Sequence, residues 1–228
     1  GGTGVAVIGS GYWPAKTARD VLDVKWEAAT GPTTADQLKI YREIALQPGL
    51  PARSDGDPAA VAAAAKRIEA VYEFPYLAHA PMEPLNAVID LKAEACTVWC
   101  GSQFQTIDQL SVATASGLKP EQVTLNTMQA GGGFGRRANP SSDYLVGGVK
   151  MAKAMEQAGI DAPVKIIWSR EDDIRGGYYR PLFVHRVVAG LDAGNALRGW
   201  SHTIVGQSIL KGTPFEKYLV KDGVDSSA

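Results

Sequence analysis

The chain has 228 residues, of which 45% are hydrophobic, and its 23 basic residues nearly balance 24 acidic ones, giving a formal net charge of −1. This apolar content can form a sizeable core, and the absence of a basic excess argues against nucleic acid as a partner. No apolar run approaches the roughly 20 residues that a membrane-spanning helix needs. We therefore expect a globular chain of one or two domains.

A glycine turn near the beginning of the chain lies between an expected strand at residues 5–8 and an expected helix at residues 14–22. A second strand is expected at residues 24–27. With Gly9-Ser10-Gly11 in the turn, this order is close to a dinucleotide-binding fingerprint. The third glycine of that fingerprint is missing, so we favour a tight turn that needs positive φ over a nucleotide site.

Residues 30–57 are rich in Pro, Gly, Thr and Asp around a short helical stretch at 34–46, which indicates a connection between domains. We therefore divide the chain into residues 1–56 and 57–228. The patterns mix helices and strands without strict alternation, which favours an α+β fold with mixed sheets. Helices are expected at 58–66, 107–116 and 142–157, strands at 68–74, 86–91, 97–99, 123–128 and 164–168, and a β-hairpin at 183–191 and 197–205.

Cys96 and Cys100 lie in an alternating pattern that points both thiols to the same face of a strand. At roughly 13 Å apart along a strand they are too distant for a disulfide, so we interpret both as packing residues. His79, His185 and His202 are scattered without the spacing of metal ligands, and no zinc site is expected.

The most informative motif is Gly131-Gly132-Gly133-Phe134-Gly135-Arg136-Arg137, between an expected strand and an expected helix. Consecutive glycines can present several backbone N–H groups to one anion. The two arginines add planar donors suited to phosphate, and the Phe134 ring can cover a flat or metal-bearing group. A flexible hairpin with two solvated arginines is the alternative. The nucleotide-triphosphate P-loop is excluded, because no Lys-Ser/Thr pair follows.

Three other polar residues are weaker candidates. Glu83 could act as an acid or base, or could be a cap or a solvated charge. Gln103 and Gln105 could donate hydrogen bonds to an oxo or carbonyl group, or could have only local roles. Residues 170–173 are expected to begin a helix or turn.

Four blocks, at residues 76–84, 101–105, 131–137 and 169–174, together resemble the large subunits of the xanthine oxidase and aldehyde oxidase family. The similarity is greatest to bacterial isoquinoline 1-oxidoreductase beta subunits and membrane-associated aldehyde dehydrogenases. The resemblance implies a fragment. Residues 1–56 would end an α/β hammerhead-like segment, and residues 57–228 would begin the molybdenum-cofactor-binding region.

The activity implied by this resemblance is oxidation of an aldehyde or N-heterocycle with water-derived oxygen at molybdenum. The family's general-base glutamate would lie beyond Ala228, so we expect the fragment alone to be inactive, with no catalytic residue or metal ligand of its own. Residues 137–140 lack the glutamate of purine-oxidising relatives, which argues against a purine substrate. The cofactor contacts that the resemblance transfers to this chain are Gly132, Gly133, Phe134, Gly135, Arg136 and Gln103.

The resemblance further implies the cytosine dinucleotide form of molybdopterin, although the isolated fragment is expected to bind no cofactor. It implies a small iron–sulfur subunit carrying 2Fe–2S clusters and a cytochrome as electron acceptor. A periplasmic or membrane-associated location is suggested, with the cytoplasm as the alternative. Two functions of other classes stay open: a dinucleotide-binding module built on Gly9-Ser10-Gly11, and a non-catalytic interaction domain.

Overall fold

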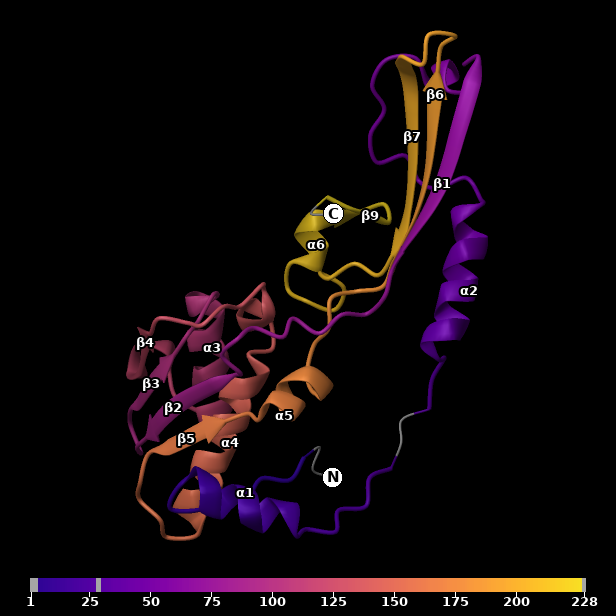
Figure 1. The fold of residues 1–228 in the computed structure, drawn as a ribbon. Coiled ribbons are helices and arrows are strands. Elements are labelled where there is room, and N and C mark those ends of the chain that lie inside the picture. The colour runs from indigo at the N-terminus through magenta and orange to yellow at the C-terminus, as the bar shows by residue number, and fades with distance from the viewer. Residues whose placement is uncertain (1–3, 28–29, 227–228) are drawn as a thin grey trace. The chain divides into compact units, whose positions relative to one another are not determined.

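A computed structural model of the chain describes residues 4–27 and 30–226 (Figure 1). The chain forms two compact units, each built from two separate stretches of sequence. Unit 1 comprises residues 1–28 and 78–179, and unit 2 comprises residues 29–77 and 180–228. The boundary drawn at residue 56 from the sequence falls inside unit 2. The α+β class is confirmed, because both units combine helices with sheets.

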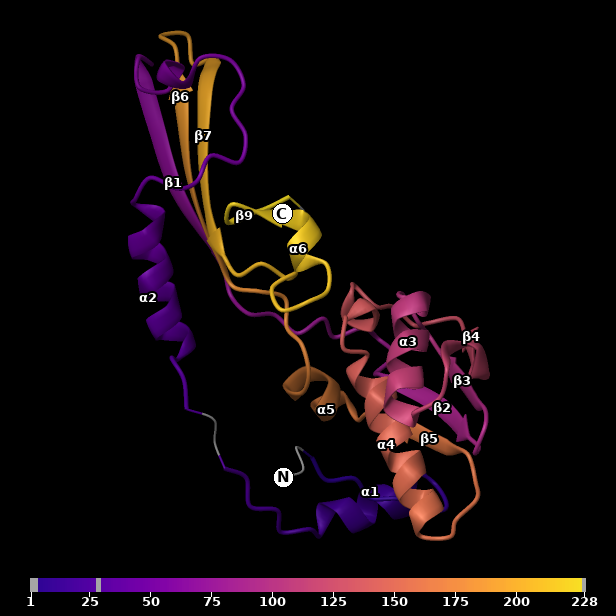
Figure 2. The ribbon, with the colours of Figure 1, turned by 180° about the vertical axis from the view of Figure 1, so that it is seen from behind.

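Unit 1 is organised around a mixed four-stranded sheet in the order β4-β3-β2-β5. Burial alternates along the strands, as expected when only one face of a sheet meets the core. Two long helices, α3 and α4, pack on the sheet, as both views show (Figures 1 and 2). The elements are β2 (Asn86–Leu91), β3 (Cys96–Cys100), α3 (Gln105–Ser116), β4 (Val123–Thr127), α4 (Asp143–Gln157) and β5 (Val164–Ile167).

The core of unit 1 is filled by alternate strand residues and by the inner faces of the two helices. Ile89 and Val98 from the sheet and Val112 and Leu145 from the helices are fully buried. Both cysteines of β3 belong to this cluster as free thiols, which confirms their interpretation as packing residues. Burial raises the pKa of Cys96 and of Cys100 to about 11.

Two helix ends of unit 1 illustrate local sequence chemistry, whereas the start of α4 does not. Helix α3 ends at Gly117, whose φ of +85° is readily adopted by glycine. Helix α5 (Arg170–Arg175) starts with a capping box between Ser169 and Asp172. Ser142 precedes α4 but does not cap it with its side chain, because its hydroxyl donates to Asp108 instead.

The expected strands at residues 5–8 and 24–27 are wrong, because neither segment pairs with another strand in the described chain. An apolar run without a partner gains no ladder hydrogen bonds. The helix between them is confirmed as α1 (Tyr12–Asp20). Gly11 has a φ of −176°, which is extended backbone, so the expected turn with positive φ is also wrong.

Unit 2 contains an antiparallel three-stranded sheet in the order β1-β6-β7. Its elements are α2 (Thr34–Ala45), β1 (Lys66–Phe74), β6 (Phe183–Leu191), β7 (Leu197–Gly206), α6 (Glu216–Leu219), β8 (Val220–Lys221) and β9 (Val224–Asp225). The predicted hairpin is confirmed, and its turn is closed by Asp192, whose carboxylate accepts from the N–H groups of Gly194 and Ala196.

The helix expected at residues 58–66 is reduced to a single 3₁₀ turn, η1 (Pro58–Ala60), capped by Asp57. Strand pairing ends it, because β1 begins at Lys66 opposite Leu191 of β6. In the described ranges, 4–27 and 30–226, no helix combines the length and apolar character needed to cross a membrane.

Candidate functional site

The glycine turn of unit 1 connects β4 to α4 through an unusual backbone conformation. Gly132, Phe134 and Gly135 have φ values of +100°, +55° and +95°. Glycine adopts such values freely, whereas for phenylalanine they are costly and are maintained only by the surrounding structure. Two short-range bonds close the turn, from Arg136 N to Gly133 O at 3.0 Å and from Ala138 N to Gly135 O at 2.9 Å.

Two other glycines approach neighbouring side chains so closely that an added Cβ atom would require those side chains to shift. A Cβ atom on Gly131 would lie 2.6 Å from Cβ of Glu83, and one on Gly133 would overlap the side-chain amide of Gln103. A third close approach is at Gly101, where a Cβ would lie 2.7 Å from that of Ala130. The turn therefore packs its backbone directly against the loops that carry Glu83 and Gln103.

The backbone N–H groups of Gly132, Gly133, Phe134 and Gly135 meet no hydrogen-bond acceptor within the part of the chain that the structure describes. Four consecutive donors of this kind can serve an anion or an electron-rich ligand atom. The Phe134 side chain is 74% exposed beside them. The turn therefore presents polar donors and one aromatic ring.

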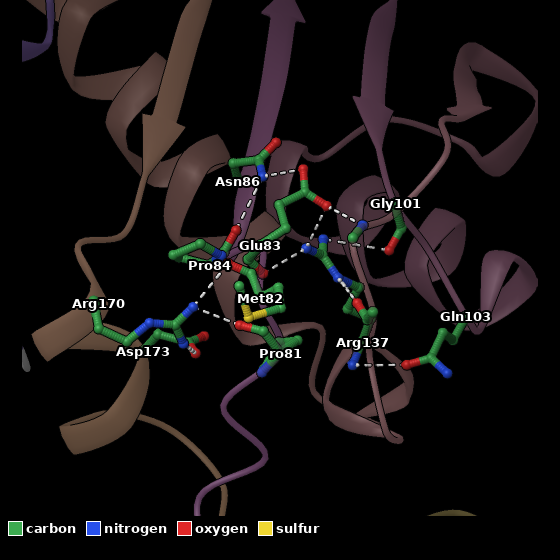
Figure 3. Close-up of polar contacts among 12 residues, drawn as sticks. Pro81, Met82, Glu83, Pro84, Asn86, Gly101, Gln103, Arg137, Arg170 and Asp173 are labelled. Carbon is green, nitrogen blue, oxygen red and sulfur yellow. Dashed lines mark hydrogen bonds and ion pairs between the residues drawn. The ribbon is translucent and has the colours of Figure 1, made fainter.

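Arg137 is almost completely buried and binds the surrounding loops (Figure 3). Its guanidinium donates to the backbone oxygens of Gly132 at 3.2 Å, Gly101 at 3.5 Å and Glu83 at 3.2 Å. It also lies 3.1 Å from Oε2 of Glu83. Its backbone exchanges two bonds with Gln103, each 3.3 Å long: Arg137 N donates to Oε1, and Gln103 N donates to Arg137 O.

Arg136 is also buried, with its guanidinium paired to both carboxylate oxygens of Asp143. The rings of Trp168 and Tyr178 lie 5.5 and 5.9 Å from its central carbon. The interpretation of the turn as a flexible hairpin with two solvated arginines is therefore wrong. Because carboxylates of the chain already neutralise both guanidinium groups, their expected role as free phosphate donors is not supported, and a cofactor contact of Arg136 stays a prediction.

The remaining candidates have defined partners. Glu83 accepts from Gly131 N at 2.6 Å and from the Asn86 amide at 2.8 Å. Burial raises the pKa of Glu83, but these bonds and the Arg137 charge outweigh it and hold that pKa below its usual value. Glu83 is therefore an anionic side chain with a structural role, which agrees with the alternative interpretation of Glu83 as a cap. Gln105 donates to Ser102 O at 3.3 Å and has a local role.

One buried carboxylate was not found from the sequence. Asp108 in α3 accepts hydrogen bonds from the hydroxyls of Ser102 at 2.5 Å and Ser142 at 2.6 Å. Burial raises its pKa although both hydroxyls oppose this effect. Asp108 thus connects the loop that carries Gln103 to the residue preceding α4. The sequence signal that could have revealed it is an acidic residue on the apolar face of the helix predicted at residues 107–116.

In unit 2 the structure brings together two histidines that appear unrelated in the sequence. Nδ1 of His185 lies 2.9 Å from Nε2 of His202 across β6 and β7. Within the described residues, no group of three or more His, Cys, Asp or Glu side chains has a metal-binding arrangement.

The Gly9–Gly11 segment also lacks the preceding strand that a dinucleotide fingerprint requires.

Comparison with known proteins identifies the fold. Residues 45–210 match the family model described as "Molybdopterin cofactor-binding domain". The chain is 31% identical, over 91% of its length, to isoquinoline 1-oxidoreductase subunit beta of Brevundimonas diminuta. It is 25% identical, over 96% of its length, to the membrane-bound aldehyde dehydrogenase (pyrroloquinoline-quinone) of Gluconacetobacter polyoxogenes. It spans only 27% and 30% of these two relatives.

A solved structure of a Cu,Mo-CO dehydrogenase shares the fold, with a TM-score of 0.59 and 18% identity over 84% of this chain and 26% of that chain. Quinoline 2-oxidoreductase from Pseudomonas putida 86 aligns with a TM-score of 0.55 and 16% identity, over 64% of this chain and 18% of that chain. The family model and the relative of 31% identity confirm the family resemblance seen in the four sequence blocks. The chain belongs to the molybdopterin cofactor-binding domain family.

Proposed function

We propose that this chain forms one wall of the molybdopterin pocket in the large subunit of a molybdenum hydroxylase that oxidises an aldehyde or N-heterocycle with oxygen from water. The observation that carries the proposal is the turn at residues 131–135, which combines a strained backbone, four N–H groups without acceptors and an exposed ring. Relatives named as an isoquinoline oxidoreductase and an aldehyde dehydrogenase support the substrate class.

The residues present fit the cofactor. The N–H groups of residues 132–135 are suited to electron-rich ligand atoms, and the Phe134 ring can cover a planar group. Gln103 uses Oε1 to accept from Arg137, which leaves its Nε2 group to donate to an oxo or carbonyl oxygen. When bound, the cofactor would supply the two-electron oxidation. These residues would bind and orient it and keep water away from its face.

The proposal extends to the cytosine dinucleotide form of the cofactor and to a small subunit with 2Fe–2S clusters. A cytochrome would accept the electrons, at a periplasmic or membrane-associated location. A relative named as a beta subunit supports an assembly of several chains. The name of the aldehyde dehydrogenase relative instead includes pyrroloquinoline quinone, whereas the family model specifies molybdopterin. A protein that binds molybdopterin should contain molybdenum, whereas one that binds only pyrroloquinoline quinone should contain none.

The test uses the complete gene product, purified after expression with its partner subunits and molybdenum-cofactor assembly proteins. Elemental analysis should find molybdenum, and mass spectrometry of the released cofactor should find the pterin with cytidine monophosphate. The protein should oxidise benzaldehyde or isoquinoline with an artificial electron acceptor. A purified complex that contains pyrroloquinoline quinone and no molybdenum would overturn the proposal.

A paired substitution tests the pocket wall itself. Gly133→Ala should lower molybdenum content, because the added methyl group overlaps the Gln103 amide. Gln103→Ala removes that overlap, so combining the two substitutions should lower molybdenum content by less than the sum of the two single effects. Gly117→Ala is a control for a glycine remote from the turn. If Gly133→Ala and Gln103→Ala both retain full molybdenum content, the proposed pocket wall at Gly133 and Gln103 is overturned.

A further inference from the structure

We infer that Arg137 and Glu83 form a positioning pair that holds the glycine turn and Gln103 in their binding arrangement before the cofactor arrives. The inference rests on the proposed cofactor role of the turn and assigns its geometry to two residues outside residues 131–135. Neither side chain needs to touch the cofactor. The pair acts through backbone groups whose direction it determines.

Charge and burial explain why the two residues act together. The Arg137 side chain is completely buried, whereas that of Glu83 is 36% exposed. A buried guanidinium is costly unless a nearby anion compensates it and its N–H groups find acceptors. Glu83 supplies the anion, and the surrounding backbone supplies the acceptors. A buried ion pair is weak evidence for net stability, and the role that we assign to this one is to define geometry.

The guanidinium of Arg137 connects three separate loops of unit 1. It donates to the backbone oxygens of Gly132, Gly101 and Glu83. Glu83 precedes β2, Gly101 follows β3, and Gly132 lies between β4 and α4. Arginine can do this because its five N–H donors lie in one plane and point in fixed directions. A lysine at this position keeps the charge but cannot reproduce the planar set of bonds.

Glu83 fixes the same turn from the other side. Its Oε2 atom accepts from Gly131 N at 2.6 Å, while Arg137 Nε donates to Gly132 O at 3.2 Å. In a trans peptide the C=O and N–H groups point in opposite directions. With Gly132 O directed at Arg137, the Gly133 N–H is directed away from Arg137. The pair therefore sets the direction of a donor assigned to the cofactor.

The segment containing Glu83 is itself held by a second arginine (Figure 3). Arg170 donates from Nη2 to the backbone oxygens of Pro81 at 2.5 Å and Met82 at 2.9 Å, and its Nη1 lies 3.0 Å from the buried Asp173. Three consecutive carbonyl groups, at residues 81, 82 and 83, are thus bound by two guanidinium groups. The backbone that carries Glu83 is consequently held by two arginines.

The experiment compares Arg137→Lys, Glu83→Gln and the double variant in the complete protein, isolated with its partner subunits. Hydrogen–deuterium exchange is measured on the cofactor-free form for a peptide spanning residues 129–138, and molybdenum content is measured on the loaded form. Val112→Ala, a core substitution in α3 remote from the turn, controls for general loss of stability. For both readouts, each variant is measured at a temperature that lies the same number of degrees below its own thermal midpoint.

We expect the hydrogen-bonded amides of this peptide to exchange ~10-fold faster in each single variant than in the Val112→Ala control, since each variant loses charge-assisted hydrogen bonds to the turn. These amides belong to Gly131, Arg136, Arg137 and Ala138. Molybdenum content should fall in the same variants. The double variant should show little further change, because the pair acts as one unit. If Glu83→Gln folds and its turn exchanges no faster than the control, the inference is overturned.

The two proposals fail in different ways. A wild-type complex without molybdenum, whose turn still exchanges faster in Arg137→Lys and Glu83→Gln, would overturn the proposed function while supporting the positioning pair. A wild-type complex with molybdenum, whose content and turn exchange are unchanged by both variants, would overturn the positioning pair alone.

Discussion

Arg136 and Asp143 form a two-pronged ion pair, in which Nη1 donates to Oδ1 at 2.9 Å and Nη2 donates to Oδ2 at 2.7 Å. The pair joins the end of the glycine turn to the first residue of α4. The Arg136 side chain is 2% exposed and Asp143 is 22% exposed. Gly177 approaches the guanidinium so closely that any side chain there would overlap it.

Arg136→Met should therefore destabilise the protein more than an exposed ion pair would, because it leaves the Asp143 carboxylate partly buried without its cation. We expect the thermal midpoint to fall by roughly 6–12 °C, given the cost of removing one partner of a buried pair. Differential scanning calorimetry of the complete protein provides the measurement. Arg198→Met, which breaks the exposed pair with Asp192, is the matched control and should shift the midpoint by only ~1–2 °C.

Two adjacent glycines in α4 should respond oppositely to the same substitution. A Cβ atom on Gly147 meets nothing within 4 Å, whereas one on Gly148 would overlap Cδ1 of Ile89. Gly147→Ala should stabilise the helix by about 0.5–1 kcal/mol, and Gly148→Ala should destabilise the core by about 1–3 kcal/mol. Thermal midpoints of the two variants measure this contrast. Equal shifts would show that α4 does not present Gly148 to the sheet.

Asp108 should make stability depend on pH. Burial raises its folded pKa, so its favourable contribution is present below the unfolded pKa and is lost as pH rises through the folded pKa. Asp108→Asn cannot ionise and escapes this loss. The thermal midpoint of Asp108→Asn relative to wild type should therefore increase between pH 4 and pH 7. A difference that is independent of pH would contradict the buried, elevated-pKa carboxyl group.

Cys96 and Cys100 should resist alkylation in the folded protein. Burial raises both pKa values to about 11, so the reactive thiolate is scarce at pH 8 and is shielded from reagent. Iodoacetamide followed by peptide mass mapping should label both only after denaturation. Rapid labelling of either residue in native protein would show that the core around the interior strand β3 opens.

The sequence predicted the elements whose patterns are local and strong. Helix α4, the β6–β7 hairpin and the strands of the unit 1 sheet were all anticipated, because their period of apolar residues matches the face they bury. The failures lie where a tertiary partner decides the outcome. Residues 5–8 have a strand-like composition but no neighbouring strand, and residues 61–65 lose their helix before the pairing of Lys66 with Leu191.

The same contrast between local patterns and tertiary contacts applies to the candidate site. The glycine turn and Gln103 were recognisable from motif and resemblance. The role of Arg137 was not, because its acceptors at Gly101, Gly132 and Glu83 come from separate loops that no local pattern connects. Local rules treat arginine as solvated or as a phosphate donor, and only the fold shows that both arginines of the motif are buried.

The interleaving of the two units has a consequence for synthesis on the ribosome. Strand β1 leaves the exit tunnel long before β6, its antiparallel partner, which follows the whole of residues 78–179. Until then β1 has an unpaired edge, the feature that drives aggregation of nascent chains. Unit 1 can complete its core first, so translation order favours closure of the four-stranded sheet before the three-stranded one. Chaperone protection of residues 66–74 during that interval should govern the yield of soluble protein.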